Sequence, residues 1–555
     1  MKRIIQRLFH TQPLAWTVMR DYEKWTKRYQ ITPDRLELAR RILNDIRQGK
    51  NVASAVSSHP IPTGGYIPKS ILVAEYKRQI EQGEALEDPL LVERIRMKPV
   101  RSLSGVTTVT VLTKPYPCPG KCIFCPDDVR MPKSYLIDEP GAARAFQHDF
   151  DPYLQVKSRL DSYEANGHPT EKIELLILGG TWSAYRHDYQ EHFIKRCFDA
   201  MNGIDSETLE EAHRINETAS HRNVGLVIET RPDEISPKEL AWLRKLGVTK
   251  VQIGIQSLDD QVLAMNKRGH TVADALLATA LLRVASFKIV LHWMPNLLGA
   301  TVQSDAIDFA RLWEDGFAPD EIKIYPCQLL EGTELHTHWQ NGEYQPYTQE
   351  ELIQLIADVK PLIQPYCRVN RVIRDIPSHH VIEGNKRTSL RQDVLAEVAR
   401  RGEKCNCIRC NEVKKQQVQS EELTMEDHIY HPVYAEEHFI HYRTPEGKIA
   451  GYLRLSLPQD TTENHPASDL NFKDLKDAAL VREVHIYGQS LAIGAEKEGA
   501  SQHIGLGKQL LEEASRIARE KGYKNLAVIA AIGTRQYYQA RGFEKGELYM
   551  VKPLV

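Results

Sequence analysis

Short runs of β-branched and apolar residues recur between about residues 105 and 326, and each is followed by a stretch long enough for a helix. Strands that alternate with helices predict a parallel sheet, and nearly continuous apolar runs are typical of strands buried on both faces. We therefore expect an α/β fold with a partial (β/α)6 barrel, in which chemistry lies at the C-terminal ends of the strands. The six predicted strands are 107–113, 173–178, 225–229, 250–255, 288–293 and 321–325.

The pattern changes after residue 325. A helix is predicted over 349–363, and from about residue 425 strands at 437–443 and 450–456 are separated by a Pro-Glu-Gly turn. A strand at 480–487, a helix at 507–520 and a strand at 525–530 follow. This order predicts a separate, small α+β domain at the end of the chain.

The length of 555 residues indicates three or four domains, since a domain has roughly 100–200 residues. We expect a basic, helical N-terminal extension at 1–95 and the barrel at 96–390. A cysteine-containing linker at 391–420 then leads to the α+β domain at 421–555.

The composition is ordinary for a globular protein, with 42% apolar and 26% charged residues. No apolar stretch approaches the ~20 residues that a membrane span needs, and the N-terminus lacks a secretory signal, so we expect no membrane contact and a cytoplasmic location. Six of the nine cysteines lie in two tight clusters. In a reducing compartment such clusters indicate metal or iron–sulfur ligation rather than disulfides.

The N-terminal 50 residues are strongly basic, with twelve Lys and Arg against five Asp and Glu. Trp16, Tyr22, Trp25 and Tyr29 are interleaved with these charges. Two interpretations are open: a nucleic-acid contact surface, or a solvated helical face whose aromatic side chains pack inward.

The first cysteine cluster, Cys118, Cys122 and Cys125, has the spacing C-x3-C-x2-C and follows the first predicted strand directly. Three thiolates can hold three irons of a [4Fe–4S] cluster and leave the fourth iron open. The amine and carboxylate of S-adenosylmethionine (SAM) can occupy that position, and one electron then releases a 5′-deoxyadenosyl radical. The alternative is a three-cysteine zinc site, which would usually contain C-x2-C and need a fourth ligand.

These features resemble the radical-SAM superfamily, and the resemblance extends beyond the cysteines. Gly179, Gly180 and Thr181 after the second strand resemble the glycine pair that lets the backbone approach the SAM amino group. The resemblance implies that Glu229 and Arg231, at the end of the third strand, contact the ribose and carboxylate of SAM. It also implies SAM contact by Gln256 and Ser257, at the end of the fourth strand.

The segment Q-x-x-G-x-G at 502–507 opens an amphipathic helix. Glycines at a helix start let backbone N–H groups approach a pyrophosphate such as that of coenzyme A. The segment resembles the pyrophosphate loop of the GNAT acetyltransferases, with the strand at 483–486 similar to their pantetheine-pairing strand. Tyr537 and Tyr538 resemble the tyrosines that approach the thioester, and an ordinary helix start with core tyrosines is the alternative. The acetyl-CoA residues expected here are Glu483, Val484, His485, Ile486, Gln502, Gly505, Leu506, Gly507, Lys508 and Tyr538.

A barrel of this kind followed by a GNAT-like domain resembles the Elongator catalytic subunit family, here in a single-chain prokaryotic form. Further similar segments are 131–135, 139–141, 150–153, 269–271, 405–410 and 533–535. The resemblance implies carboxymethylation at C5 of the tRNA wobble uridine in the anticodon loop, with acetyl-CoA, SAM and an electron donor. It also implies contact of Lys172 with the acyl-CoA. A homodimer is compatible with the sequence. The chain departs from the family at 295–299 and in its C-x3-C spacing, which is shorter than in eukaryotic members.

The second cysteine cluster, Cys405, Cys407 and Cys410, has the spacing C-x-C-x2-C. It predicts a structural zinc site, for which Cys327 after the sixth strand is the candidate fourth ligand. Unpaired buried thiols are the alternative.

Two other functions are compatible with parts of this sequence. One is a protein lysine acetyltransferase in which Glu483 or His485 acts as the base and the cluster is structural. The other is a noncatalytic tRNA-binding scaffold. Neither needs the complete set of SAM-contacting residues, which therefore favours the radical enzyme.

Overall fold

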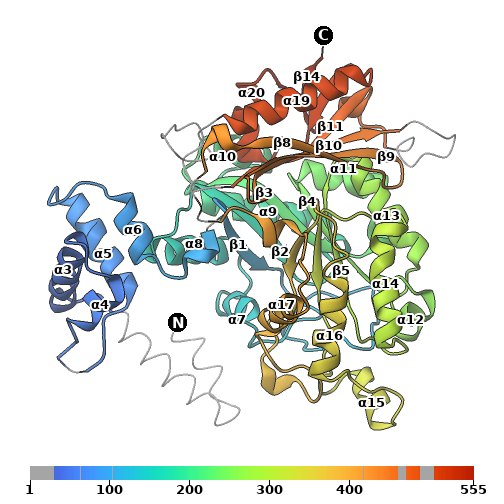
Figure 1. The fold of residues 1–555 in the computed structure, drawn as a ribbon, viewed down its shortest axis with the longest axis horizontal. Helices are drawn as coiled ribbons and strands as arrows, with labels where there is room; N and C mark the ends of the chain where they lie inside the picture. The colour runs from blue at the N-terminus through green and yellow to red at the C-terminus, as the bar shows by residue number, and fades with distance from the viewer. Residues whose placement is uncertain are drawn as a thin grey trace. The chain divides into compact units, whose positions relative to one another are not determined.

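The computed structural model describes residues 30–62, 64–102, 104–414, 416, 418–459, 470–487 and 505–554. These residues form two compact units, shown in Figure 1. One contains residues up to 102 together with 159–170, and the other contains 104–158 and the residues from 171 onward. Among the described helices, none combines the length and the apolarity that a membrane span requires.

The first unit is helical in its described part. Its helices are α3 (Pro33–Arg47), α4 (Val52–Ser57), α5 (Lys69–Glu81) and α6 (Pro89–Ile95). They enclose a core that includes Ile42, Leu43 and Leu72. Within the basic segment predicted at 1–50, residues 1–29 with both tryptophans lie outside the described residues, so tRNA contact there stays a prediction.

The second unit contains a parallel sheet of seven strands in chain order. The strands are β1 (Thr107–Leu112), β2 (Lys172–Leu178), β3 (Arg222–Thr230), β4 (Lys250–Gln256), β5 (Lys288–Trp293), β6 (Glu321–Ile324) and β7 (Arg368–Arg371). The predicted half-barrel of parallel strands is confirmed. The structure adds β7, whose sequence Arg-Val-Asn-Arg carries no hydrophobic signal for a buried strand.

Helices connect these strands on the outside of the sheet, as crossover connections between parallel strands require (Figure 1). They are α7 (Pro140–Gln147), α8 (Pro152–Ala165), α9 (His187–Asn202), α10 (Leu209–Asn216), α11 (Pro237–Lys245), α12 (Asp260–Met265), α13 (Val272–Val284) and α14 (Val302–Glu314). After β6 the chain forms α15 (Glu334–Gln340), α16 (Gln349–Val359), α17 (Leu390–Arg400) and α18 (Ile408–Asn411).

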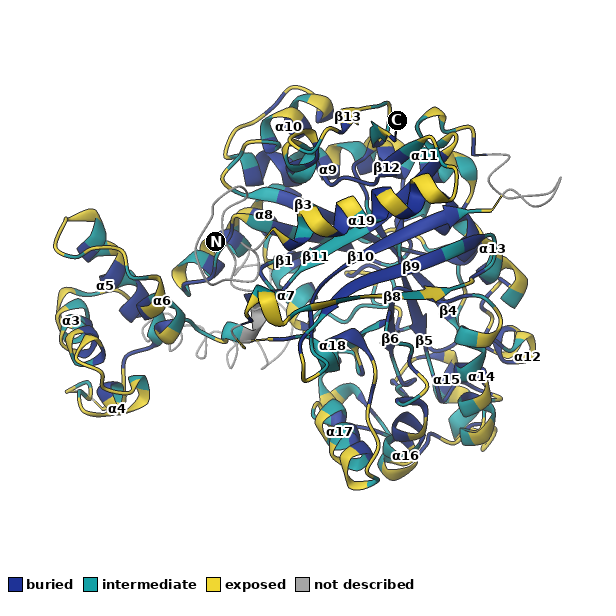
Figure 2. Cartoon of the chain, turned by 45° about the horizontal axis from the view of Figure 1, so that its top comes forward, coloured by how far each residue is buried: buried dark blue, intermediate teal, exposed yellow. Residues whose placement is uncertain are grey.

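The last part of the chain forms a second, mixed sheet in the order β13-β14-β12-β11-β10-β9-β8. Its strands are β8 (Thr424–Tyr430), β9 (Ala435–Arg443), β10 (Ile449–Pro458), β11 (Ala478–Ile486), β12 (Asn525–Val528), β13 (Glu544–Lys545) and β14 (Met550–Pro553). Helix α19 (Leu506–Glu520) packs on β10 and β11 through its buried face, while its other face is exposed (Figure 2). Helix α20 (Arg535–Gln539) follows β12. This α+β arrangement agrees with the sequence prediction.

Buried ion pairs join the two sheets. Asp320, directly before β6, accepts two hydrogen bonds from Arg482 of β11, at 2.6 and 2.7 Å. Arg482 also pairs with Glu437 of β9 at 2.9 Å, and all three side chains are fully buried. Full pairing compensates the loss of hydration that these charges suffer. The second sheet is therefore held at the N-terminal ends of the barrel strands, within the same compact unit.

Candidate functional site

The first cysteine cluster lies in the loop directly after β1, at the C-terminal end of the barrel strands. Cys118, Cys122 and Cys125 are free thiols and each is partly buried. The sulfur of Cys118 is 3.4 Å from the hydroxyl of Thr181, and the sulfur of Cys122 accepts a hydrogen bond of 2.9 Å from Arg268. The cluster, the glycine pair and the turn between α12 and α13 therefore meet at one edge of the sheet.

The spacing of these sulfurs differs from that of a single-ion site. Zinc–sulfur bonds of about 2.3 Å keep sulfur ligands within about 4.6 Å of one another. Among the described residues, two groups have ligand atoms within 4.8 Å of each other, and the first cysteine cluster is not one of them. A four-iron cluster spreads its thiolates further apart than one ion does. The three sulfurs are therefore not gathered as the ligands of one zinc ion would be.

The electrostatics of the loop favour a thiolate. A hydrogen bond from the Cys125 thiol, together with the guanidinium groups of Arg268 and Arg231, lowers the pKa of Cys122 to about 5. The hydrogen bond that the Cys125 thiol donates to Cys122, together with burial, raises the pKa of Cys125. Thiolates are the form that ligates iron, so at least one ligand is available at neutral pH.

The glycine pair follows β2 in a conformation that other residues rarely adopt. Gly179 has φ of +138° and Gly180 has φ of +88°. A Cβ atom on Gly179 would lie 1.8 Å from the hydroxyl of Thr113, so no side chain fits there. The turn thus brings bare backbone to the cysteine loop, as the resemblance to SAM enzymes implies.

Glu229, near the end of β3, lies in a cluster of polar side chains from several elements. It accepts a hydrogen bond of 3.3 Å from Tyr135 and lies 3.6 Å from Nδ1 of His292 on β5. Arg374, after β7, lies over the ring of Tyr135 and pairs with Glu139 at 3.1 Å. Sequence reasoning did not assign Tyr135, His292 or Arg374 to the site; the only signal was the position of 131–135 and 139–141 among the family-like segments.

Arg231 and Gln256 both carry unused polar atoms. Arg231 pairs with Asp233 and donates to the carbonyl of Arg268, but its Nη1 atom is buried without a partner. Oε1 of Gln256, at the end of β4, is also buried without a partner. Unsatisfied buried groups cost free energy, and a bound ligand with its own donors and acceptors would satisfy them. Both residues therefore fit a SAM-binding role.

Ser257 is placed differently from its neighbours. Its hydroxyl donates a hydrogen bond of 3.2 Å to Asp308 of α14, and it accepts one from the backbone of Asp259. The hydroxyl is thus used within the loop after β4, and the structure does not bring it to the cysteines.

The expected acetyl-CoA residues gather where β11 and β12 separate. These parallel strands pair only from Ala478 to Val481, so the second half of β11, with Glu483, Val484, His485 and Ile486, extends beyond the pairing. Gly505, with φ of +71°, and Leu506 begin α19 next to it. A Cβ atom on Gly507 would lie 2.6 Å from the hydroxyl of Tyr537 and 3.8 Å from Ile486. A strand edge and a helix start therefore converge on the tyrosines of α20.

The other expected acyl-CoA residues differ in burial and in position. Tyr538 is buried next to Tyr537, and Lys508 is exposed. Lys172 begins β2 beside Arg222, whose side chain contacts Gly533 just before α20. Burial lowers the pKa of Lys172. Gln502 lies outside the described residues.

Glu483 and His485 are buried and held by their surroundings. Burial alone would raise the pKa of Glu483, but Lys288 and Arg454 hold it at about 2. Glu483 also accepts a hydrogen bond of 2.8 Å from Tyr452. Burial lowers the pKa of His485 to about 4, and its Nε2 atom has no hydrogen-bond partner. At neutral pH the carboxylate is ionised and the imidazole is neutral.

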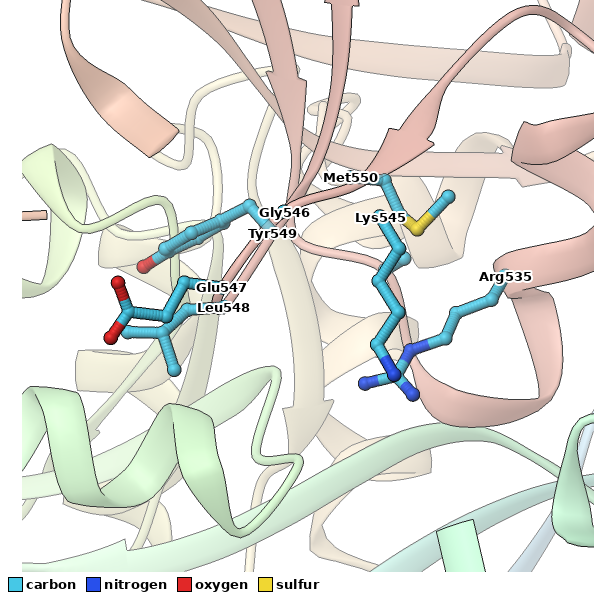
Figure 3. Close-up of a pocket in the computed structure, with 8 residues that line it drawn as sticks. Arg535, Lys545, Gly546, Glu547, Leu548, Tyr549 and Met550 are labelled. Atoms are coloured by element: carbon cyan, nitrogen blue, oxygen red, sulfur yellow. The ribbon is translucent and has the colours of Figure 1, made fainter. Parts of the chain in front are cut away.

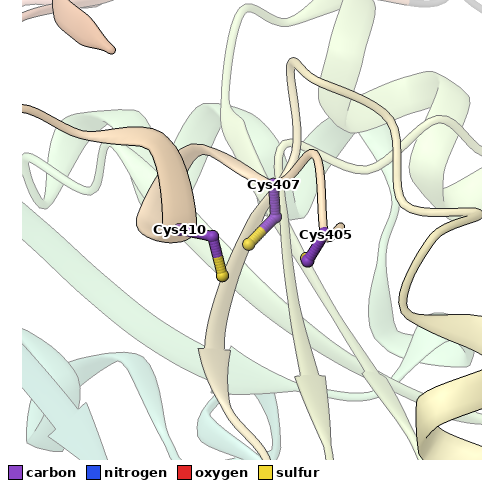
Figure 4. A group of neighbouring side chains, drawn as sticks. All are labelled: Cys405, Cys407 and Cys410. Atoms are coloured by element: carbon purple, nitrogen blue, oxygen red, sulfur yellow. The ribbon is translucent and has the colours of Figure 1, made fainter. Parts of the chain in front are cut away.

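The second cysteine cluster is compact. The sulfurs of Cys405, Cys407 and Cys410 lie within 4.8 Å of one another, and Figure 4 shows them pointing toward a common centre. Lys360 donates to Cys405 at 3.4 Å. Three sulfurs at this spacing fit the ligand set of a single zinc ion.

The prediction that Cys327 joins this group is wrong. Cys327 packs in a hydrophobic cluster with Cys122, Cys125 and Leu297. The backbone N–H of Ile408, in the segment of the second cluster, donates a hydrogen bond to the carbonyl of Cys367, just before β7. Cys327 instead follows the C-terminal end of β6. Since β6 and β7 are parallel, the two positions lie at opposite ends of the sheet.

A small pocket near α20 and β14 is lined by two cationic side chains, those of Arg535 and Lys545. Figure 3 shows the side chains of Arg535 and Lys545 directed to the same space, with Glu547 and Tyr549 on the other side. Arg535 pairs with Glu217 at 2.9 Å. None of the predicted site residues lines this pocket.

Comparison with known proteins identifies both parts of the barrel. Residues 116–310 match the Radical SAM superfamily, and 319–400 match the Radical_SAM C-terminal domain. The tRNA uridine(34) acetyltransferase of Methanocaldococcus jannaschii is 40% identical over 540 residues, which cover 93% of this chain and 97% of that protein. The chain belongs to the Elongator Elp3 family.

Eukaryotic Elp3 proteins extend the similarity. Elongator complex protein 3 of Danio rerio is 35% identical over 84% of this chain and 87% of its own length. The structure of Methanocaldococcus infernus Elp3, with N-terminal residues 1–46 deleted, covers 81% of this chain and 99% of its own. It aligns with a TM-score of 0.70 at 36% identity. The Elp3 relationship thus includes the barrel and the second sheet together.

Proposed function

We propose that the chain attaches a carboxymethyl group to C5 of the wobble uridine of tRNA, using acetyl-CoA and SAM. The observation that carries the proposal is that one compact unit contains both the loop with Cys118, Cys122 and Cys125 and the part of β11 that extends beyond its pairing with β12. The relatives named as tRNA uridine(34) acetyltransferases support the choice of uridine.

The residues at the C-terminal ends of the strands fit a cluster and SAM. Cys118, Cys122 and Cys125 would hold three irons, while the backbone of Gly179 and Gly180 leaves room for the SAM amino group. Nη1 of Arg231 and Oε1 of Gln256 are buried without a partner and would bind SAM together with the carboxylate of Glu229. When bound, the cluster and SAM supply a 5′-deoxyadenosyl radical strong enough to remove a hydrogen atom from an acetyl methyl group.

The second sheet would bind and orient acetyl-CoA rather than transfer its acetyl group to an amine. Beyond Val481, β11 no longer pairs with β12, and its backbone at Val484 would lie along the pantetheine amides. The backbone at Gly507 would approach the pyrophosphate at the N-terminus of α19. Tyr537 and Tyr538 would contact the thioester end, with Lys172 beside them. Binding that fixes the acetyl group in one orientation contributes directly to rate.

The position of the two sites constrains the substrate. Lys172 and Gly179 lie at opposite ends of β2, roughly 23 Å apart for seven extended residues. An acetyl group held beside Lys172 would therefore have to move along the barrel strands to the glycine pair before it reacts.

The electrostatics disfavour a lysine acetyltransferase. A base that deprotonates an amine at neutral pH needs a pKa near 7. Lys288 and Arg454 hold Glu483 near a pKa of 2, and burial holds His485 near 4. Neither side chain suits that role, and this supports a binding function for the strand.

The second cysteine cluster would hold zinc. Cys405, Cys407 and Cys410 would be its protein ligands, and its place beside β7 would brace the segment between the two sheets. The basic N-terminal arm would attract the phosphates of tRNA, while the barrel mouth receives a splayed base of the anticodon loop.

The test is anaerobic reconstitution of the full chain with iron and sulfide, followed by incubation with tRNA, SAM and acetyl-CoA. Mass analysis of the tRNA nucleosides should show carboxymethyluridine at the wobble position, dependent on both SAM and acetyl-CoA. Wild-type protein that acetylates peptide lysines and leaves uridine unmodified would overturn the proposal.

A further inference from the structure

Arg268 lies in the turn between α12 and α13 and contacts the cysteine loop. Its side chain is buried, with the residue only 5% exposed. Nη1 donates to the sulfur of Cys122 at 2.9 Å, and Nη2 donates to the backbone carbonyl of Gly254 at 2.6 Å. Two bonds to different partners fix the plane of the guanidinium, so the orientation toward the sulfur is set before any ligand binds.

The backbone of this residue is also held in place. Arg231 donates to the carbonyl of Arg268 at 2.6 Å and is itself held by Asp233 at 2.8 Å. A Cβ atom on Gly120, within the cysteine loop, would lie 2.4 Å from Nη1 of Arg231. The two guanidinium groups therefore form one layer against the loop.

The charges of the two arginines are balanced differently. Arg231 has a carboxylate partner in Asp233. Over the part of the chain that the structure describes, no carboxylate pairs with Arg268, and its only anionic partner is the sulfur of Cys122. A buried guanidinium needs a compensating charge, and a metal-bound thiolate is anionic.

Hydrogen-bond donors exceed acceptors around the loop. Nε of Arg268 and Nη1 of Arg231 are both buried without partners. An iron–sulfur cluster carries negative charge and sulfur acceptors, so it would satisfy such donors.

We infer that Arg268 is a positioning residue that holds Cys122 for the cluster and raises the cluster's reduction potential. The inference rests on the proposed function, because that function places the cluster on Cys122. Hydrogen bonds to cluster sulfurs and nearby positive charge stabilise the reduced, more negative state. Arg268 supplies both to one ligand.

If Arg268 has only a structural role, a different result is expected. If Arg268 served only to tie the turn to Gly254, its replacement would lower stability but leave the potential of a bound cluster unchanged. The midpoint potential therefore separates the two roles.

The experiment compares reconstituted wild type with Arg268→Gln, Arg268→Lys and the control Lys267→Gln. Lys267 is the neighbouring cation, but its side chain is 52% exposed and pairs with Glu334 at the surface. Iron and sulfide per chain are measured first, and the midpoint potential then follows from a redox titration monitored by electron paramagnetic resonance.

We expect Arg268→Gln to shift the reduction equilibrium about tenfold toward the oxidised cluster. For a one-electron couple, this lowers the midpoint potential by about 59 mV. Arg268→Lys keeps the charge and should shift it less, while Lys267→Gln should match wild type. Loss of the hydrogen bond from Arg268 to Cys122 should also weaken iron retention about 10- to 100-fold under chelator challenge.

Equal midpoint potentials in wild type and both Arg268 variants would overturn the inference. If Arg268→Gln loses its cluster while its unfolding midpoint stays that of wild type, the positioning role is supported and Arg268→Lys reports the potential. If wild type itself takes up no four-iron cluster, the proposed function fails, which is a result distinct from a loaded wild type with an insensitive Arg268.

Discussion

Lys288, the first residue of β5, donates a hydrogen bond to Glu483 of β11 at 2.5 Å, with both side chains almost fully buried. The bond joins the barrel to the strand expected to bind acyl-CoA. Four residues further along β5, His292 lies beside Glu229, which is expected to bind SAM. One strand therefore supports both candidate sites, one at each end.

Replacing Lys288 by Met should destabilise the protein by about 3–5 kcal/mol, because Glu483 would keep a buried charge with one partner fewer. The double variant Lys288→Met with Glu483→Gln should recover part of this loss. The measurement is chemical unfolding of the four combinations. Lys524→Met is the control, since its pair with Asp477 is exposed and should contribute less than about 1 kcal/mol.

Replacing Cys118, Cys122 or Cys125 by Ala should abolish 5′-deoxyadenosine formation from SAM and prevent four-iron cluster uptake. Each of these thiols would be one of the three protein ligands of the proposed cluster. Cys197→Ala is the matched control, because Cys197 is a buried thiol of α9 that belongs to neither cysteine cluster. Iron analysis and product chromatography check the outcome, and wild-type turnover in any of the three variants would exclude the radical mechanism.

Replacing Gly507 by Ala should weaken acetyl-CoA binding at least tenfold, since the new Cβ would meet the Tyr537 hydroxyl at 2.6 Å. Adding Tyr537→Phe removes that oxygen and should restore much of the affinity. Calorimetric titration with acetyl-CoA measures both effects. Affinity equal to wild type in the single variant would place the coenzyme elsewhere.

Acid should destabilise the protein partly through His485. Burial lowers its folded-state pKa to about 4, below the usual value of 6.5, so the unfolded chain binds its proton first. The stability that this group contributes is present above pH 6.5 and falls as the pH drops toward 4, by roughly 3 kcal/mol in all. Thermal unfolding between pH 7 and 4.5 should show a shallower loss for His485→Gln than for wild type.

Replacing Cys407 by Ser should remove one equivalent of zinc from the purified protein, whereas Cys327→Ser should retain it. The sulfur of Cys407 lies in the compact group, and that of Cys327 lies at the other end of the sheet. Metal analysis by mass spectrometry distinguishes the two, and zinc loss from Cys327→Ser would contradict the assignment.

Local patterns were enough to predict most of the fold. The six apolar runs gave the barrel strands because a strand buried on both faces must be apolar along its whole length. The seventh strand, Arg368–Arg371, escaped this signal because its polar side chains are paired through tertiary contacts, such as Arg368 with Glu412.

The sequence by itself determined which chemical groups are present and which of them are neighbours in one loop. The spacing of Cys118, Cys122 and Cys125, and the glycines after β2, are local features that need no long-range contact to recognise. Only the tertiary structure decided which distant residues meet. It brought Arg268 to Cys122, separated Cys327 from Cys405, and paired Glu483 with Lys288. The physical reason is that such pairs depend on strand order and direction, which fix the end of the sheet at which each side chain lies.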